Sequence, residues 1–242
     1  MATLILVRHA RSTANTSGVL AGRTAGVELD ETGHAQATRT GARLAPVPLA
    51  GLICSPMQRC LQTAQAILDP RSDSLTTRVD EDLNECDYGQ WQGRKLTDLA
   101  GEKLWSVVQN HPSAAVFPGG ESLAAMQARA VAAIRRHDAA IEAEHGPGAV
   151  WAAVSHGDLI KSILADALGL HLDLFQRIGV NPASASIVRY TSSRPDVVAM
   201  NTDAGDLSWL SAQTGTRTGA AEAQVGGGAG PEADAAEAPG GS

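Results

Sequence analysis

The chain has 242 residues, of which 43% are hydrophobic and 19% are charged, as expected for an ordinary globular protein with a hydrophobic core. The net charge of −7 argues against a protein that binds nucleic acid or a membrane surface, because such proteins present a basic face. Cys54, Cys60 and Cys86 are odd in number and have no C-x-x-C spacing, so neither a disulfide framework nor a zinc site is indicated.

The sequence enters an apolar run almost at once, at residues 3–8. That leaves too little room for the hydrophobic core of a signal peptide, and no stretch approaches the length of a transmembrane helix. We therefore expect a cytoplasmic protein without a membrane segment.

Short apolar runs alternate with helical patterns through the first 200 residues, which is typical of an α/β domain with a mostly parallel sheet. Strands are expected at residues 3–8, 51–54, 149–154, 186–191 and 196–200, with a weaker one at 76–80. Helices are expected at residues 32–44, 57–68, 96–109, 121–144 and 157–168, and Gly169 suits the end of the last helix.

These elements predict one three-layer α/β/α domain over residues 1–210, with residues 88–120 as a helical excursion above the sheet edge. Residues 215–242 differ in composition, because they are rich in Gly, Ala, Glu and Pro and contain Val225 as their single large aliphatic side chain. Such a segment cannot bury enough apolar surface to offset the loss of chain entropy. We therefore predict that residues 215–242 form a disordered tail.

Arg8 and His9 follow the first expected strand, at the edge of the sheet where open α/β folds bind ligands. A neutral imidazole can attack phosphorus, and the planar guanidinium of Arg8 suits phosphate oxygens. The alternative is a salt-bridged arginine beside a capped histidine, and this pair alone does not decide between the two.

Arg59 lies in the first turn of the helix expected at residues 57–68, so its guanidinium and the helix N-terminus face the same sheet edge. Ser55 and Pro56 are also typical of a plain helix start, with Ser55 as the cap. The spacing from Cys54 to Arg59 is one residue shorter than a cysteine phosphatase loop requires. We therefore interpret Cys54 as a small buried apolar residue.

Glu85 lies in a loop of acids, aromatics and glycines, and His156 closes the strand at residues 149–154. A carboxyl group withdrawn from water can protonate a leaving alkoxide, but this loop taken alone favours the alternative that Glu85 is one of several solvated acids. His156 either stabilises phosphoryl oxygens or is an exposed residue of a capping turn. Neither His9 nor His156 has a second metal ligand at helical or turn spacing, so no metal site is expected.

Together these segments place two arginines, two histidines and one glutamate at or beyond strand ends of one sheet. Separate structural explanations would have to coincide in all four segments, whereas phosphate chemistry explains them together. No P-loop glycine-lysine motif and no N-terminal Asp-x-Asp nucleophile competes for this role.

The chain resembles the histidine phosphatase superfamily, which has the phosphoglycerate mutase-like fold, over residues 3–191. The resemblance rests on five segments in the family's order: LVRHARSTAN at 6–15, SPMQRCLQTA at 55–64, LNECDYGQWQG at 83–93, PGGES at 118–122 and VSHG at 154–157. By this resemblance His9 is the phosphohistidine nucleophile, Glu85 is the proton donor and His156 is a further catalytic residue. The residues implied in phosphate binding are Arg8, Arg59, His156 and Asn15.

The resemblance implies no metal ion and no cofactor. Ala10 stands where the family usually has glycine, and we expect the loop to be intact but slightly more crowded. Arg11, where glutamate is common, adds positive charge near the site. Arg11 and Arg23 are therefore candidate contacts to the substrate.

The resemblance favours a metal-independent, histidine acid-type phosphatase that hydrolyses a small organic phosphomonoester through a phosphohistidine intermediate. A phosphomutase of the phosphoglycerate mutase type is the alternative, although mutases of this family carry a sizeable insertion where residues 93–120 form a short excursion. A non-enzymatic binder of phosphorylated ligands is a third hypothesis, opposed by the presence of all five catalytic positions. The physiological substrate stays open, as does a homodimer, which is common in similar proteins.

The apolar side chains of the excursion allow two interpretations: they line a substrate cavity, or they pack this part of the chain onto the sheet. The packing interpretation is favoured, because apolar residues are most often buried in a core. The residues concerned are Trp91, Leu96, Leu99, Trp105, Val116 and Phe117.

Overall fold

A six-stranded sheet forms the middle layer of the computed structural model, which describes residues 2–203 and Gly226. The strand order is β3-β2-β4-β1-β5-β6, in which β1, β2, β3 and β4 run parallel, β5 pairs antiparallel with β1, and β6 pairs antiparallel with β5 at the edge. The mostly parallel sheet expected from the sequence is therefore confirmed. The strands are β1 (Thr3–Arg8), β2 (Leu49–Cys54), β3 (Thr77–Val79), β4 (Val150–Ser155), β5 (Ala185–Tyr190) and β6 (Pro195–Thr202).

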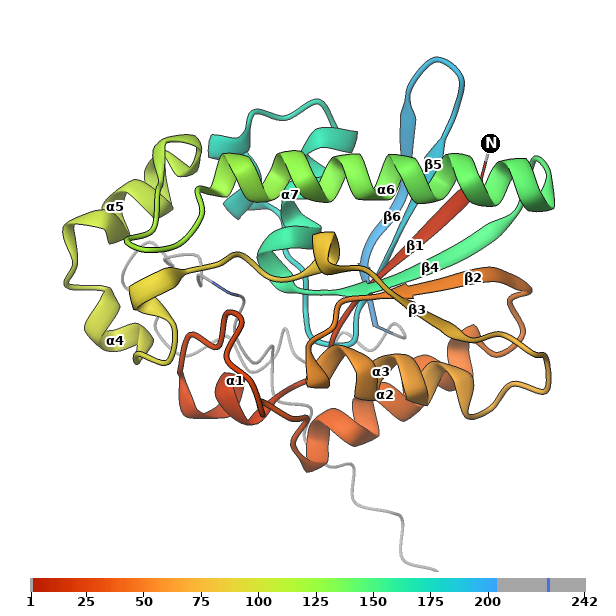
Figure 1. Ribbon diagram of the computed structural model, residues 1–242, viewed down its shortest axis with the longest axis horizontal. Coiled ribbons are helices and arrows are strands. Elements are labelled where there is room, and N and C mark those ends of the chain that lie inside the picture. The colour runs from red at the N-terminus through yellow and green to blue at the C-terminus, as the bar shows by residue number, and fades with distance from the viewer. Residues whose placement is uncertain (1, 204–225, 227–242) are drawn as a thin grey trace, which may run out of the picture.

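Helices cover both faces of this sheet, which confirms the three-layer arrangement (Figure 1). The helices α2 (Glu31–Leu44) and α3 (Gln58–Leu68) lie on one face, and α6 (Leu123–His145) and α7 (Gly157–Ala167) lie on the other. The remaining helices are α1 (Thr13–Ser17), α4 (Leu96–Leu99) and α5 (Lys103–Asn110). Short 3-10 turns occupy Glu81–Leu83, Gly89–Trp91, Pro112–Ala114 and Leu172–Arg177.

The side chains of β1 show why the sheet needs a helical layer on each face. Leu4 and Leu6 belong to the apolar cluster under α6 and α7, whereas Ile5 and Val7 belong to the cluster under α2 and α3. Successive side chains of a strand point to opposite faces, so a continuously apolar strand must be covered on both.

The helix expected at residues 96–109 is wrong as a single element. The structure has two short helices there, because the chain leaves the first at Ala100 and starts the second after Glu102. Gly101 lies between them, and glycine is a poor helix former. The other expected strands and the longer helices are confirmed, with ends that differ by a few residues. Gly169 follows α7 with a φ of 67°, as a helix-ending glycine does.

Within the excursion, the packing interpretation is right for most of the apolar side chains. Trp91, Leu99, Trp105 and Phe117 are buried in the larger apolar cluster, and the rings of Trp91 and Trp105 stack with centroids 6.2 Å apart. Val116 is 61% exposed.

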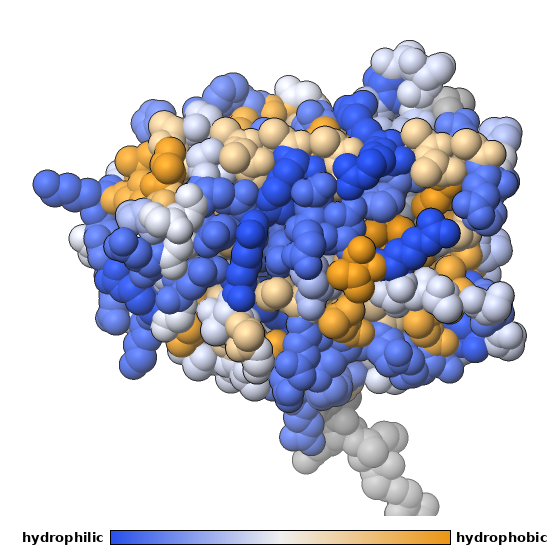
Figure 2. Space-filling view, viewed as in Figure 1, coloured by the Kyte–Doolittle hydropathy of each residue, from blue (hydrophilic) through white to orange (hydrophobic). Residues whose placement is uncertain are grey.

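The surface seen in Figure 2 is mainly hydrophilic, with hydrophobic residues in small separate groups. Among the described helices, none combines the length and the apolar character that a membrane span requires. Apart from Gly226, the tail predicted at residues 215–242 lies outside the described residues.

The sheet brings three strand ends together. β4 lies between β1 and β2, all three are parallel, and their registers pair Arg8 with Ser155 and Cys54 with Val154. The residues that follow, His9, Ser55 and His156, therefore emerge at one edge of the sheet.

Candidate active site

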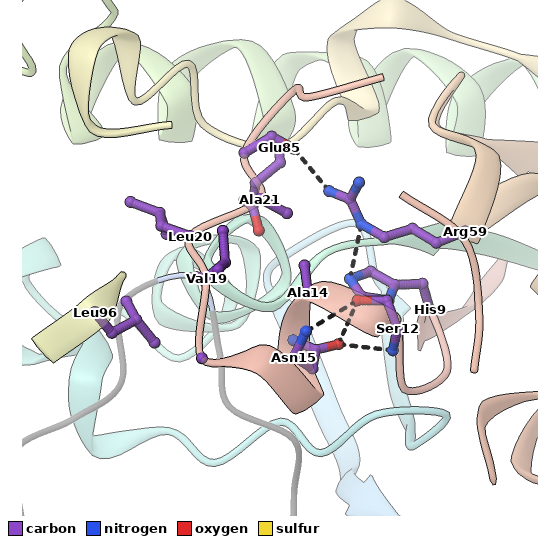
Figure 3. A pocket seen from close by; sticks show the side chains of 13 residues that line it. His9, Ser12, Ala14, Asn15, Val19, Leu20, Ala21, Arg59, Glu85 and Leu96 are labelled. Atoms are coloured by element: carbon purple, nitrogen blue, oxygen red, sulfur yellow. Dashed lines mark hydrogen bonds between the residues drawn. The ribbon is translucent and has the colours of Figure 1, made fainter. Parts of the chain in front are cut away.

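A small cavity lies at this edge, between the end of β1, the start of α3 and the loop that carries Glu85 (Figure 3). Its volume is about 50 Å³, enough for a few waters or one phosphoryl group. Four of the predicted site residues line it, namely His9, Asn15, Arg59 and Glu85.

The imidazole of His9 is fixed in one tautomer by its neighbours. Its Nδ1 lies 2.8 Å from the Ala10 carbonyl oxygen, to which it must donate a proton, so the lone pair lies on Nε2. The Nε–H of Arg59 donates to that Nε2 at 3.2 Å. Burial, together with the charges of Arg59 and Arg8, holds the pKa of His9 well below its usual value. His9 is therefore a neutral base, and its unprotonated Nε2 accepts from Arg59 at the cavity that both residues line.

Arg59 links the residues of the site to one another. It is the second residue of α3 and is 2% exposed, and its Nη2 donates to the Gly22 carbonyl at 2.7 Å and to Nδ1 of His156 at 3.1 Å. Its Nη1 is buried and has no hydrogen-bond partner among the described residues. A buried guanidinium with an unused donor is a costly arrangement unless an anion completes it.

His156 is completely buried, so the alternative of an exposed histidine in a capping turn is wrong. Because its Nδ1 accepts from Arg59, its Nε2 carries the proton and donates to Oγ of Ser55 at 2.7 Å. Burial and the charge of Arg59 hold the pKa of His156 well below its usual value.

The prediction of Ser55 as the helix cap is wrong. The helix begins at Gln58 with Met57 as its N-cap, and the Ser55 hydroxyl is taken by His156 instead. A serine before a proline looks the same in the sequence whether it caps a helix or binds a distant histidine. The sequence alone therefore did not reveal this contact.

Arg8 is buried behind the cavity and does not line it. Its Nη1 donates to the Val180 carbonyl at 2.8 Å. Burial lowers the pKa of Arg8 to about 10, which leaves its guanidinium charged at neutral pH, and its charge acts on both His9 and Glu85.

Glu85 is 2% exposed, so its interpretation as a solvated acid is wrong. Its Oε1 accepts the backbone N–H of Cys86 at 3.0 Å. Burial and the nearby charge of Asp158 raise the pKa of Glu85 to about 7. Near neutral pH this carboxyl group is therefore able to hold a proton and to release it.

The loop that carries Glu85 is held by Arg129, which no sequence motif singled out. Its Nη1 donates to the carbonyls of Asp82 and Asn84 at 2.7 and 2.8 Å, and its Nη2 donates to the carbonyl of Glu85 at 3.0 Å. Glu121, from the PGGES segment, pairs with the same guanidinium. The backbone around the acid is therefore fixed from α6.

The two arginines predicted as substrate contacts are both engaged within the protein. Arg11 pairs through Nε with Asp30 at 2.8 Å and is not among the residues that line the cavity. Arg23 donates to the Glu85 carbonyl at 2.9 Å and pairs with Glu121 at 2.9 Å.

The segment after His9 tolerates its alanine. Ala10 is fully buried and has no positive φ, and its N–H donates to Oγ1 of Thr63 at 3.1 Å. The Asn15 side chain accepts from the backbone N–H of Ser12 at 3.0 Å and thereby closes a capping box at α1.

The cysteines are buried free thiols, and burial raises the pKa of Cys54, of Cys60 to about 12, and of Cys86. Such thiols are poor nucleophiles, which agrees with the apolar interpretation of Cys54. Over residues 2–203 and Gly226, no group of three or more His, Cys, Asp or Glu side chains is arranged to hold a metal ion.

Sequence patterns also did not reveal a buried hydrogen-bonded pair next to the acid. Asp158, in the first turn of α7, is completely buried and accepts the hydroxyl proton of Tyr88 at 2.8 Å. A carboxyl group in the first turn of a mostly apolar helix, two residues after His156, was the available signal.

Comparison with known proteins identifies relatives of this chain. The family model described as "Histidine phosphatase superfamily (branch 1)" matches residues 4–203. A phosphoserine phosphatase 1 from Hydrogenobacter thermophilus is 27% identical over 83% of this chain and 92% of its own length. A 2,3-bisphosphoglycerate-dependent phosphoglycerate mutase from Mesorhizobium japonicum is 38% identical over 50% of this chain, and the match spans only 61% of that mutase. The solved structure of Bacillus stearothermophilus YhfR has the same fold, with a TM-score of 0.75 and 24% identity over 83% of this chain and 97% of its own.

Proposed function

This chain belongs to the histidine phosphatase superfamily, and on that basis we propose that it is a phosphomonoester hydrolase that acts through a phosphohistidine on His9. The observation that carries the proposal is the fixed tautomer of His9, whose unprotonated Nε2 lies at a cavity of phosphoryl size beside a buried guanidinium with an unused donor. No metal is needed for charge compensation, because Arg8 and Arg59 both carry positive charge there.

In the first step, Nε2 of His9 attacks phosphorus and the bond from phosphorus to the ester oxygen breaks. Arg59, whose Nε now donates to that Nε2, turns its donors to the phosphoryl oxygens, joined by the charge of Arg8 and by His156. Glu85 gives its proton to the departing oxygen, so the leaving group departs as an alcohol.

In the second step, the Glu85 carboxylate takes a proton from water, and that water attacks the phosphorus. The bond between phosphorus and Nε2 breaks, which returns His9 to its neutral form and releases inorganic phosphate. A carboxyl pKa of about 7 suits both halves, because the group must be an acid first and a base afterwards.

A phosphomutase remains the second candidate, because mutases are among the relatives. A mutase must keep the phosphohistidine from water and return the phosphoryl group to its product. The match to a phosphoserine phosphatase along nearly the whole of that relative favours hydrolysis. We further propose a cytoplasmic location and a small organic phosphate as substrate, with Asn15 as an assisting phosphate contact.

The test is phosphate release from p-nitrophenyl phosphate and from a panel of small phosphomonoesters, with 2- and 3-phosphoglycerate included and their interconversion measured. We expect phosphate release from the wild type, and a loss of roughly 10⁴-fold or more in His9→Ala. His34→Ala is the matched control, because His34 is an exposed residue of α2. Faster interconversion than phosphate release would favour the mutase, and binding without either reaction would favour a non-enzymatic binder.

A further inference from the structure

One residue from the C-terminal part of the chain, Gly226, lines the cavity. Gly226 lines the same cavity as His9, Glu85 and Leu96, although it is far from them in sequence. Its backbone N–H donates to Oδ2 of Asp158 at 2.9 Å. A backbone group from the C-terminal part of the chain therefore satisfies a buried carboxyl group next to the proposed acid.

The fit of Gly226 is close. Its φ is 73°, which side chains other than glycine rarely adopt, and an added Cβ would lie 2.7 Å from Cδ1 of Leu20 and 3.8 Å from the Tyr88 hydroxyl. Gly226 thus lies against Leu20 and Tyr88 with its N–H on Asp158, in a backbone conformation that favours glycine.

Asp158 is equipped to accept such a group. Its Oδ2 receives the Tyr88 hydroxyl at 2.8 Å, and its Oδ1 lies 3.5 Å from Nζ of Lys161. The Lys161 ammonium is itself held by Oε1 of Gln176 at 3.0 Å. Without Gly226, Oδ2 would keep the Tyr88 hydroxyl but lose its second donor, and a buried acceptor that loses a donor is unfavourable.

The space that Gly226 fills is also the space that an organic leaving group needs. The remaining cavity of about 50 Å³ accommodates a phosphoryl group but not the alcohol attached to it. The proton donor Glu85 lines the same cavity, so the alcohol must leave on this side.

We propose that Asp158 is a specificity-determining residue that accepts an N–H of the substrate's leaving group, in the position that Gly226 takes in this structure. The substrate class is a phosphomonoester whose alcohol carries an amine or amide nitrogen close to the ester oxygen. This inference rests on the proposed phosphatase activity. Gly226 acts as an internal competitor, and the apparent KM equals the intrinsic KM divided by the fraction of molecules in which Gly226 has left the position.

The test compares phosphoethanolamine with n-propyl phosphate, which has the same chain length but no nitrogen. We expect the wild type to prefer phosphoethanolamine in kcat/KM by roughly 10-fold to 100-fold, as a hydrogen bond to a charged group does. Asp158→Asn should reduce that preference to about threefold or less, because the amide carries no charge and directs a donor at the substrate.

The ratio of the kcat/KM values for the two substrates cancels any effect that is the same for both, such as a change in the proton affinity of Glu85. Asp138→Asn is the matched control, since Asp138 is another buried carboxyl group but lies on α6 and accepts from Trp151 of β4, whereas Asp158 accepts from Gly226, which lines the cavity. In Asp138→Asn, the ratio of kcat/KM for phosphoethanolamine to kcat/KM for n-propyl phosphate should equal that of the wild type. A preference that is the same in Asp158→Asn and in the wild type would overturn the inference.

Gly226→Ala tests the internal competitor. The added methyl group and the positive φ should displace the residue, which should lower KM for both substrates by severalfold without changing their ratio. An unchanged KM would contradict the assignment of Gly226 to the leaving-group position.

A measurement on the wild type alone keeps the inference testable if Asp158→Asn does not fold. Phosphoethanolamine should inhibit hydrolysis of p-nitrophenyl phosphate at least tenfold more tightly than n-propyl phosphate, and equal inhibition would overturn the inference. Hydrolysis of p-nitrophenyl phosphate also separates the two proposals. Its absence would overturn the phosphatase and this inference together, whereas its presence without an amine preference would overturn this inference alone.

Discussion

Burial shifts pKa values in opposite directions on the two sides of the cavity. The cationic side consists of His9 and Arg59, which line the cavity, together with the neighbouring Arg8 and His156; the carboxyl side consists of Glu85, which lines the cavity, together with the neighbouring Tyr88 and Asp158. On the cationic side, burial and neighbouring guanidiniums lower the pKa of both histidines and keep them neutral. On the carboxyl side, burial and a second carboxyl group raise the pKa of Glu85 to about 7. One desolvated cavity thus provides a free base and a protonated acid at the same pH.

The two sides also differ in how they are built. The cationic side comes from the ends of adjacent parallel strands and the start of α3, so the sheet itself sets its geometry. The carboxyl side comes from a loop fixed by Arg129 and from the first turn of α7. We therefore expect changes on the cationic side to affect every substrate alike, and changes on the carboxyl side to depend on the leaving group.

Arg59→Ala should distinguish the two sides with the largest effect. This substitution removes the N–H groups that donate to His9 and His156, and it removes Nη1, which has no partner in the described structure and is available to a phosphate. We therefore expect kcat/KM to fall about 10³-fold. The loss should be the same for alkyl and aryl phosphates, measured as initial rates of phosphate release. A loss confined to one class of ester would break the distinction between the two sides.

Glu85→Gln should lower kcat/KM by about 10²-fold for alkyl phosphates but only a few-fold for p-nitrophenyl phosphate, whose leaving group needs little protonation. In the wild type, the rate with alkyl phosphates should fall as the pH rises above about 7, because the acid loses its proton. That decline should be absent in Glu85→Gln. An equal loss on both kinds of ester would remove Glu85 from its role as the acid.

Ser55→Ala should have a smaller kinetic effect, of about tenfold or less, which corresponds to roughly 1 kcal/mol for one hydrogen bond. Without the Ser55 hydroxyl, the proton of His156 is no longer held on Nε2, so its Nδ1 competes less well for the Arg59 N–H. Ser55→Thr, which keeps the hydroxyl group, is the control and should retain more activity. A larger loss of activity in Ser55→Thr than in Ser55→Ala would show that the size of the side chain, and not its hydrogen bond to His156, determines the effect.

The carboxyl side should also have a measurable effect on stability. The pKa of Glu85 rises from an ordinary value of 4.5 in the unfolded chain to about 7 in the folded one. As the pH rises from 4.5 to 7, the unfolded state loses this proton first, so the contribution of Glu85 to wild-type stability falls and then levels off. Relative to the wild type, Glu85→Gln should gain on the order of 3 kcal/mol of unfolding free energy between pH 4 and pH 8. Urea denaturation of both proteins at pH 4 and pH 8 measures this difference. If the unfolding free energies of Glu85→Gln and the wild type differed by the same amount at the two pH values, the raised pKa would be contradicted.

Sequence patterns predicted the sheet and the long helices because the continuous apolar runs of β1 and β4 and the apolar periodicity of α6 are local properties of the chain. The break at Gly101 and the role of Ser55 were not predictable in the same way. Ser55 has the pattern of a helix cap, and only the convergence of β2 and β4 shows that its hydroxyl meets His156.

The proposed catalytic residues were recognisable because they follow strands in short motifs. Asp158 was overlooked because its importance depends on contacts with Tyr88 and Gly226, which are distant in sequence. Arg11 shows the reverse case: its charge suggested a substrate contact, but its ion pair with Asp30 is a long-range property that the sequence did not disclose.

The most direct test of this account is to quench the wild type in alkali during turnover of a small phosphomonoester and to locate the bound phosphate by peptide mass spectrometry. The account predicts one phosphorylated residue, His9, modified at Nε2 and absent from His9→Ala. Turnover without any phosphoenzyme, or phosphate attached to a residue other than His9, would contradict it.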